Sequence, residues 1–580
     1  MGFPIFITQK EFVSQLSSCL SKHIGETGKN FTCVVKRNRD LKGGDFVVPK
    51  GHSQDLLSEE MLATFKRACQ EKACGNGIQI QTVSASPAFP VCIFLHRGTV
   101  FQSVLSEVKK QGSAYGIIRY GHACERCHRV VLLHLSALTS KVIGPGVESC
   151  LPINCLRSLT LLNHMRQLLV TNRHTVRCVP SQLTSHAEHL FKLLEIDYPG
   201  PADLTEVTNR LKTAAMKSKY RCDRWQQGET EKQTTGFPCT SPPGEEDSCV
   251  SINLRQFLMD NPALTGFDKN INIADVIKNG HPTDLLHGVS CLEKEYCSCK
   301  QDSIGQPDVS VSVLHLTPHS RSFINQQVAL LWRILSPAAS SVKQVHLVHG
   351  PTVAPPSVKH QLTPETFYSL IENEMREAAV MKYGDQVQGP GWERSITCLT
   401  QATVKMELLN SSCRNTVKLS IPQNTDDLGG PKRCGTFVMY NCARLAMLFS
   451  HFNQAVEKGT YPEMPPVEEI DFSVLREEEE WILMFNYLWP YPDVVAEAVA
   501  CLTPASTSPN SIGIHTHKVC NFLVSLSQHV STYYSRCHIL GESRPHLYAL
   551  MFARLYLMKG VHQVMRNGLA LMGIQPLNQL

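Results

Sequence analysis

Apolar residues at helical spacing dominate the chain from about residue 430 to its end. The first stripe is followed by Gly459, a residue type that often ends a helix. A second stripe runs from Val519 to Tyr534, and a third helical segment extends from about 543 to Gly573. The first stripe comprises Leu445, Leu448, Phe449, Phe452 and Val456. Because a strand would need apolar residues at every second position, residues 430–580 are predicted to form a helical bundle.

This bundle is acidic near its start, at Glu477–Glu480, and basic at its end. Residues 501–580 contain six Lys and Arg but one acid, Glu542, whereas the whole chain carries a net charge of only +5. Tyrosines and histidines lie between these basic residues, a combination that attracts a phosphate backbone and unstacked bases. The alternative is a solvated helical surface with scattered arginines, and charge alone does not separate the two. The six are Lys518, Arg536, Arg544, Arg554, Lys559 and Arg566.

The rest of the chain mixes strands and helices. At 580 residues there is room for about three domains. Residues 1–118 are predicted to form a small α+β domain, with strands at Ile78–Thr82 and Val91–Leu95 and a helix at Thr99–Gln111. Residues 119–429 alternate between strands and helices, which predicts a Rossmann-like domain with a parallel sheet. The composition of residues 220–251 predicts a disordered insertion within it. The fold class is therefore multidomain α/β plus all-α.

Cysteines and missing motifs bound the chemistry. The 23 cysteines favour free thiols in a reducing compartment, and no long apolar run indicates a membrane span, so we expect a cytoplasmic protein. The pair Cys124 and Cys127 stays open as a zinc site, with an irregular group at 291–299 as its distant partner. Phosphate-loop, nucleophile-elbow and HExxH motifs are absent from the sequence. We therefore predict no catalytic residues, no metal and no cofactor.

The C-terminal segments resemble arginyl-tRNA synthetases. Tyr491–Val495 resembles their Phe-Pro-Glu-Val-Val, and His517–Leu540 resembles a helix that ends in Phe-Tyr before Cys-Pro-Val-Leu. Arg554–Ile574 resembles their last helix, and Gly435–Arg444 resembles the entry helix. This is the DALR anticodon-binding domain, but its name-giving tetrad reads Lys-Gly-Val-His at 559–562.

Upstream, the resemblance is weaker and the catalytic signatures are lost. Gly44-Asp45-Phe46, Ala85–Phe89 and Lys110–Gly116 resemble the synthetases' N-terminal extra domain. Where a class I synthetase has His-x-Gly-His before Leu-Arg-Ser, this chain has Pro-Ile-Asn-Cys at 152–155. The lysine-bearing second motif is also absent from 351–360. Each lost charge donor of this kind costs about 3 kcal/mol of transition-state stabilisation.

The whole architecture resembles the family called DALR anticodon-binding domain-containing protein 3. That resemblance implies a noncatalytic adaptor that recognises arginine tRNAs and delivers them to a 3-methylcytidine tRNA methyltransferase. The alternatives are a divergent active arginyl-tRNA synthetase and a protein–protein scaffold with a relic tRNA domain. The basic side chains are expected to contact phosphates, and Tyr533, Tyr534 and His538 to stack on bases. The full set of expected RNA contacts is Lys518, Tyr533, Tyr534, Arg536, His538, Arg544, Arg554, Lys559, His562 and Arg566.

Overall fold

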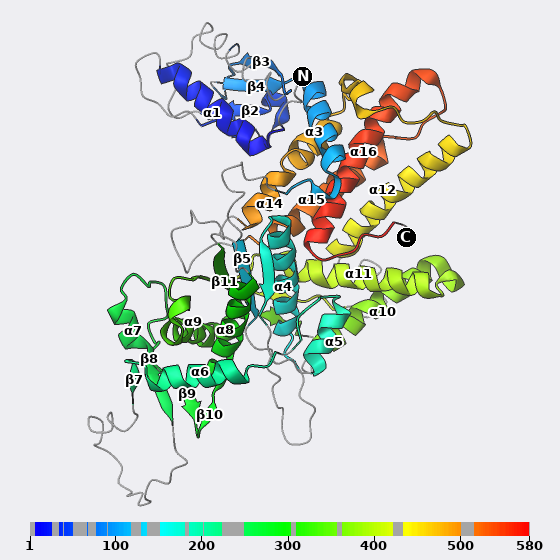
Figure 1. Cartoon of the computed structure of the whole chain (residues 1–580). Coiled ribbons are helices and arrows are strands. Elements are labelled where there is room, and N and C mark those ends of the chain that lie inside the picture. The colour runs from blue at the N-terminus through cyan, green and yellow to red at the C-terminus, as the bar shows by residue number, and fades with distance from the viewer. Residues whose placement is uncertain are drawn as a thin grey trace, which may run out of the picture.

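A computed structural model describes most of the chain, and Figure 1 shows it as an N-terminal unit, a central sheet with an insertion, and a helical bundle. No helix of the described part is long and apolar enough to cross a membrane. The described residues are 6–25, 34–38, 40–49, 67, 77–86, 88–89, 91–117, 129–135, 151–179, 185–200, 202–222, 249–302, 309–356, 362–421, 433–499 and 515–578.

The N-terminal unit is an antiparallel sheet of order β1-β2-β4-β3. β4 has the predicted bounds, β3 begins two residues later than predicted, and the helix α3 ends before Gly112, whose φ is +53°. The elements are α1 (Gln9–Gly25), β1 (Lys36–Arg37), η1 (Leu41–Gly43), β2 (Phe46–Val48), β3 (Ile80–Ser84), β4 (Val91–Leu95), α3 (Arg97–Gln111) and η3 (Gly112–Ala114). The α+β prediction is thereby confirmed.

The centre is a parallel sheet of order β12-β11-β5-β6. β5 and β11 are neighbours in the sheet although an insertion separates them in sequence, so the strand order reverses between them, as in Rossmann-like folds. The elements are β5 (Arg129–Leu135), α4 (Asn154–Thr171), β6 (Thr175–Cys178), α5 (Ser185–Leu193), β11 (Ser310–Pro318), η6 (His319–Arg321), α9 (Ser322–Leu335), η7 (Pro337–Ala339) and β12 (Lys343–His349). Helices cover both faces, which is why the strands are nearly continuous apolar runs.

The insertion between β6 and β11 has its own antiparallel sheet, β10-β9-β8-β7. Its elements are α6 (Thr205–Met216), β7 (Arg221–Cys222), β8 (Val250–Asn253), α7 (Leu254–Asp260), β9 (Ile273–Lys278), β10 (His281–Pro282) and α8 (Asp284–Asp302). The prediction of disorder over 220–251 is wrong at both ends of that segment, where β7 and β8 pair with each other. These ends are ordered because Tyr220 and Val250 are buried there. Residues 223–248 lie outside the described residues.

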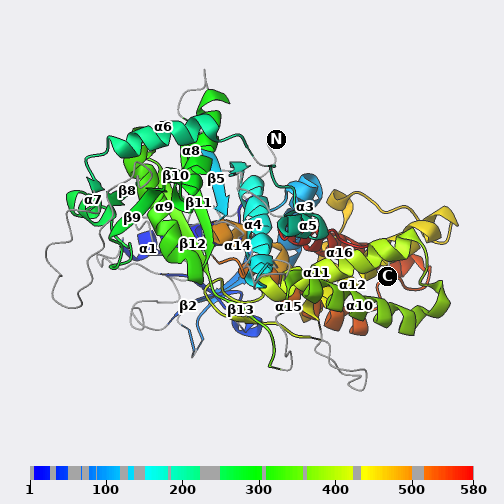
Figure 2. The ribbon, with the colours of Figure 1, turned by 90° about the horizontal axis from the view of Figure 1, so that it is seen from below.

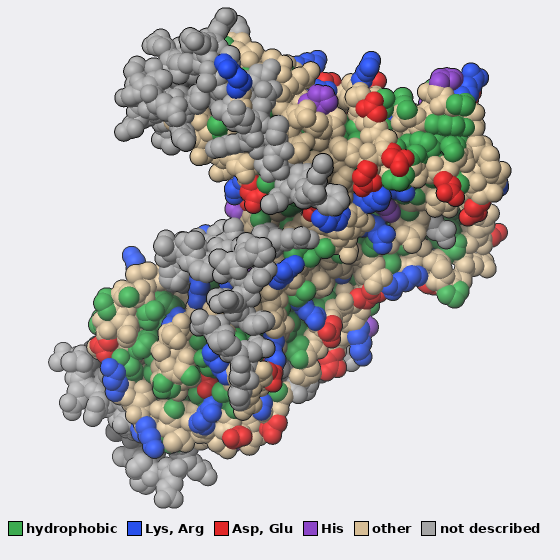
Figure 3. All heavy atoms as spheres, turned by 45° about the horizontal axis from the view of Figure 1, so that its top comes forward, with side chains coloured by type: hydrophobic (Ala, Val, Ile, Leu, Met, Phe, Trp, Pro, Cys, Tyr) green, Lys and Arg blue, Asp and Glu red, His purple; other side chains and the backbone are tan. Residues whose placement is uncertain are grey.

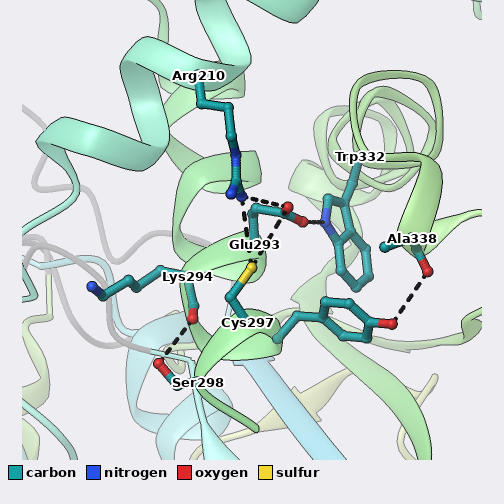
Figure 4. A network of polar contacts seen from close by, with 8 residues as sticks. Arg210, Glu293, Lys294, Cys297, Ser298, Trp332 and Ala338 are labelled. Atoms are coloured by element: carbon teal, nitrogen blue, oxygen red, sulfur yellow. Dashed lines mark hydrogen bonds and ion pairs between the residues drawn. The ribbon is translucent and has the colours of Figure 1, made fainter. Parts of the chain in front are cut away.

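A buried carboxylate, Glu293, ties this insertion to the central sheet (Figure 4). Its Oε1 accepts a 2.7 Å hydrogen bond from Arg210 of α6, and its Oε2 accepts a 2.8 Å bond from the indole of Trp332 on α9. The Cys297 thiol also donates to Oε1. Both oxygens are therefore satisfied, which a buried charge requires, and α6, α8 and α9 are held together.

Residues 433–499 and 515–578 are mostly helical, as predicted for 430–580. The helices at 364–383 and 390–409 pack with them, although they fall in the range 119–429 that was predicted to be Rossmann-like. Figure 2 shows α10, α11 and α12 side by side, and both neighbouring pairs are in contact. Glu477 caps α13 through a reciprocal capping box with Glu480, Gly459 has a φ of +70° just after α12, and Pro492 is the second residue of α14. The elements are β13 (Thr352–Val353), α10 (Pro364–Tyr383), η8 (Gly384–Gln386), α11 (Pro390–Leu409), β14 (Val417–Lys418), α12 (Cys434–Glu457), η9 (Val467–Glu469), η10 (Phe472–Val474), α13 (Glu478–Leu483), the π-helix η11 (Met484–Leu488), α14 (Tyr491–Val499), α15 (Lys518–Arg536) and α16 (Pro545–Leu571).

The N-terminal unit shares one core with this bundle. Phe46 lies 5.2 Å from Phe485 and 6.2 Å from Trp489, measured between ring centroids. A Cβ on Gly560 of α16 would lie 2.7 Å from Leu105 of α3, so this glycine permits close helix packing. Because Gly560 has no side chain, α3 and α16 pack closely and join the two units.

Candidate nucleic-acid interface

Two of the three N-terminal motifs that resemble the synthetases contact the bundle. Asp45 is buried, and its two carboxylate oxygens accept hydrogen bonds from the indole of Trp481 at 2.8 Å and from the backbone N–H of Leu95 at 2.7 Å. Burial raises the pKa of Asp45 despite these bonds. Tyr115 donates a 2.8 Å bond to the carbonyl of Leu488, and burial also raises the pKa of its phenol. These motif residues therefore hold the N-terminal unit on the bundle.

The position of the first class I signature is occupied by the start of α4. Arg157 is fully buried there, and its guanidinium donates to the carbonyls of Gly350 at 2.8 Å and Asn415 at 2.6 Å. Asn154 accepts a 2.6 Å bond from the backbone N–H of Thr352. These polar groups bind the protein's own backbone, so they are not directed toward a bound phosphate.

The chain after β12 is also held by contacts with the protein's own backbone. β13 pairs in parallel with β14, and a Cβ on Gly350 would lie 2.5 Å from the carbonyl oxygens of Arg414 and Asn415. This close approach places residues 350–353 against residues 412–418. Residues 357–360, the rest of the region compared with the second class I motif, lie outside the described residues.

Four of the six predicted phosphate contacts are paired with acids. Lys518 pairs with Glu497, Arg536 with Glu479, Arg544 with Glu542 and Arg554 with Glu480. Figure 3 shows Lys and Arg interspersed with Asp and Glu over the face it presents. The basic excess of the C-terminal segment is therefore largely balanced by acids that the fold places beside it.

The Arg554 pair is internal. Glu480 has a side chain only 1% exposed, and its Oε1 accepts from Arg554 at 2.9 Å and from the Tyr533 hydroxyl at 3.0 Å. Tyr533 is completely buried, and burial raises its pKa strongly. Base stacking by Tyr533 is therefore excluded in this conformation, since no face of its ring is accessible. Arg554, with a side chain 14% exposed, likewise stabilises the bundle.

Lys559 and Arg566 remain exposed on one side of α16, seven residues apart. The Nζ atoms of Lys559 and of Lys109 on α3 lie 6.0 and 5.9 Å from the Tyr556 ring. Partial burial of the Lys559 ammonium group, together with the positive charge of Lys109, lowers the pKa of this otherwise exposed lysine. Sequence reasoning missed Lys109, because only packing of α3 on α16 brings it there.

His562 lies between these two basic residues but is half-buried. Its ring packs 5.6 Å from that of Phe449, and burial lowers its pKa to about 4. It is therefore neutral at pH 7 and cannot supply a cationic phosphate contact there. Its Nε2 has no hydrogen-bond partner among the described residues.

A further candidate surface is the end of the bundle, where the loop after α12 meets the loop before α16. The Tyr461 hydroxyl donates a 2.5 Å bond to the carbonyl of Gly541, and the hydroxyls of Ser543 and Tyr548 are 2.8 Å apart. His538 and Arg544 are exposed at this end, as an RNA contact requires. Tyr461 was not predicted from the sequence, because the loop that carries it has no periodic pattern.

The cysteines of the described residues form no metal-binding site. No group of three or more His, Cys, Asp or Glu side chains with metal-binding geometry occurs among the described residues. Cys291, Cys297 and Cys299 follow one another along α8, and Cys124 and Cys127 lie outside the described residues.

Known proteins resemble this chain both in one domain and over most of its length. Residues 438–580 match the family model of the DALR anticodon binding domain. The chain is 33% identical to DALR anticodon-binding domain-containing protein 3 of Danio rerio, over 93% of this chain and 92% of the relative. The chain belongs to the family of DALR anticodon-binding domain-containing protein 3. The member of this family from Mus musculus is also 33% identical, over 93% of this chain and 94% of its own length. The family resemblance read from the motifs is thereby confirmed.

This chain resembles arginyl-tRNA synthetases in fold over nearly its whole length, but in sequence over only about a quarter of it. The arginine–tRNA ligase of Acidithiobacillus ferrooxidans is 32% identical over 144 residues, which are 25% of this chain and 21% of the ligase. The arginyl-tRNA synthetase structure of Thermus thermophilus superimposes with a TM-score of 0.57 at 12% identity, covering 98% of this chain and all of that one. The Plasmodium falciparum synthetase gives a TM-score of 0.58 at 11% identity, covering 99% of this chain and all of that one. At these identities the structures share the fold alone.

Proposed function

We propose that this protein is a cytoplasmic, noncatalytic tRNA-binding adaptor. Its C-terminal bundle binds the anticodon stem-loop of arginine tRNAs, and the protein presents these tRNAs to a methyltransferase that forms 3-methylcytidine. The observation that carries tRNA binding is the DALR anticodon binding domain over residues 438–580. The choice of arginine tRNAs and of the methyltransferase is supported by the family resemblance.

The lack of aminoacylation in this proposal is supported by the edge of the parallel sheet. Pro152 to Cys155 stand where the synthetase signature has its two histidines. Nearby, Arg157 is bound to backbone carbonyls and Asn154 to the backbone of Thr352. A class I site instead needs charge donors that are aimed at the reacting phosphate.

The first test is RNA capture from cells, followed by sequencing of the RNA that copurifies. Enrichment of arginine tRNAs is the expected result, and equal recovery of all tRNAs would contradict the specificity. The second test is loss of the protein, which should lower 3-methylcytidine only in the tRNAs that it binds, because an adaptor acts by raising local substrate concentration. Mass spectrometry of purified tRNAs measures this. Normal 3-methylcytidine in every arginine tRNA would overturn the adaptor role.

Two other functions give different outcomes in cheap assays. Arginine-dependent pyrophosphate exchange by the pure protein would indicate an active synthetase. Absence of copurifying RNA, with the methyltransferase still captured, would indicate a protein–protein scaffold. Surface substitutions suit these tests better than deletion of residues 430–580, because deletion would expose the core side chains of the N-terminal unit, such as Phe46.

A further inference from the structure

One face of α12 carries aromatic and basic side chains at helical spacing. Its members lie three or four residues apart, so they form one line along the helix. Tyr440 is 45% exposed and Met447 38% exposed, and none of the seven members is acidic. The positions are Phe437, Tyr440, Arg444, Met447, His451, Gln454 and Lys458, the last being the residue that caps the C-terminal end of α12. The α12 strip, as we call these seven residues, is not needed for the core, because Leu445, Leu448 and Phe452 of the same helix are buried.

Side chains from two other helices complete this surface. The guanidinium carbon of Arg444 lies 3.8 Å from the ring centroid of Tyr534 on α15. Lys382 of α10 lies 5.9 Å from the Tyr440 ring and 4.8 Å from the Tyr383 ring. The α12 strip and the neighbouring α10 thus present two cations stacked over tyrosine rings, an arrangement that keeps their N–H donors accessible at the ring edge.

The charge of the α12 strip favours nucleic acid as its occupant. Arg444, Lys458 and Lys382 are positive, His451 is exposed, and no carboxylate lies on the strip itself. Four of the six cations predicted from the C-terminal sequence are instead paired with acids. A protein partner's surface would usually place charges of both signs opposite such a strip, whereas RNA offers phosphates and flat bases together.

We propose that the α12 strip, with Tyr534 and Lys382, binds unpaired nucleotides of the bound RNA. Tyr440 and the Arg444–Tyr534 pair stack on bases, and Lys382, His451 and Lys458 contact phosphates. Tyr440 to Lys458 spans about 27 Å at 1.5 Å per residue, which accommodates several nucleotides. This inference rests on the proposed tRNA binding and adds a second contact surface to the end of the bundle.

The test is tRNA binding by the full-length double variant Tyr440→Ala/Arg444→Ala, in gel-shift titrations with an arginine tRNA transcript. We expect at least tenfold weaker binding, together with weaker binding of a short unstructured RNA, whereas a blunt RNA duplex should be affected little. Tyr440→Trp should bind like the wild type, since its ring still stacks. Asn453→Ala is the matched control, because Asn453 is exposed on α12 but off the strip.

Salt dependence separates the two kinds of contact. Lys458→Ala should lower the slope of log K against log salt by about 0.7, the value for one phosphate contact to a single strand, while Tyr440→Ala should leave the slope unchanged. If the double variant has a lower melting temperature, His451→Glu/Lys458→Glu replaces it, because both side chains are exposed at the surface. This second variant should also bind RNA at least tenfold more weakly.

The outcomes distinguish this inference from the proposed function. If the wild type binds no tRNA, the proposed function fails, and the inference fails with it. If the wild type binds and both double variants bind equally well, the proposed function stands and the α12 strip is overturned as an RNA surface. Normal RNA binding with lost capture of the methyltransferase would overturn it too, and would assign the strip to protein docking.

Discussion

Trp481 and Asp45 are 436 residues apart in sequence, yet the indole Nε1 of Trp481 donates a 2.8 Å hydrogen bond to Oδ1 of Asp45. The bond joins the first unit of the chain to the last. Around it, Phe101 lies 5.8 Å from Trp481 and Phe485 lies 5.2 Å from Phe46. The N-terminal unit and the bundle therefore share one core, and damage to one is expected to reach the other.

Asp45→Ala should lower the free energy of unfolding by about 2–6 kcal/mol. It leaves two buried donors without partners, the Trp481 indole and the Leu95 backbone N–H, and each orphaned group costs about 1–3 kcal/mol. Urea denaturation measures the loss. Asp197→Ala is the control, since the Asp197 side chain is 88% exposed in its pair with Arg166 and such a pair contributes about 1 kcal/mol or less. Equal losses would mean that Asp45 does not join the units.

Gly116→Ala should destabilise the protein more than Gly384→Ala. Both glycines have positive φ, +101° and +58°, so each substitution strains the backbone by about 1–3 kcal/mol. A Cβ at Gly116 would also lie 2.5 Å from the Tyr491 ring, whereas nothing lies within 4 Å of one at Gly384. The extra cost at Gly116 is expected to be about 1–3 kcal/mol. Thermal melting compares the two variants, and identical melting temperatures would contradict the close contact.

Arg554→Ala and Lys559→Ala should separate stability from RNA binding. Removing Arg554 leaves the buried Glu480 carboxylate without its cation, which costs about 3–5 kcal/mol. Lys559 is exposed and pairs with no acid among the described residues, so its removal should change stability by less than about 0.5 kcal/mol. The Lys559 variant should instead weaken tRNA binding and lower its salt slope by about 0.9. A Lys559 variant with unchanged affinity and slope would remove this residue from the interface.

Lys405→Met should change how stability depends on pH. The ammonium group of Lys405 is fully buried and donates to the carbonyls of Leu194 at 2.9 Å and Gly573 at 2.6 Å. Burial lowers its pKa from 10.5 to about 8. Between these two values the unfolded chain holds a proton that the folded protein has released, so stability rises with pH in this window. The rise from this group is at most about 3 kcal/mol.

Chemical denaturation at several pH values from 7.5 to about 10.5 measures this difference between the wild type and Lys405→Met. The wild-type free energy of unfolding should gain on that of the variant as the pH increases. Parallel curves would mean that Lys405 keeps an ordinary pKa in the folded protein.

Local patterns in the sequence were sufficient for the helices of the bundle and for several strands. The apolar stripe from Leu445 to Val456 lies on α12, and Gly459 follows it with positive φ. The strand Val91–Leu95 has the predicted bounds. Helical period, strand runs and end signals depend on residues within a few positions of one another, so they can be read without the fold. The motifs also identified the family, because they are short and contiguous.

Long-range packing decided what each side chain of the candidate interface does. The sequence shows six basic residues and two adjacent tyrosines. It does not show that Arg554 and Tyr533 donate hydrogen bonds to Glu480 inside the bundle. Two neighbours on a helix point in directions about 100° apart, so Tyr533 is buried while Tyr534 lies under Arg444. The sequence by itself determined the helices of the bundle, several strands and the family, because those signals are local. Only the tertiary structure decided which charges are neutralised and which remain for RNA, because a charge's partner comes from wherever the fold brings another helix.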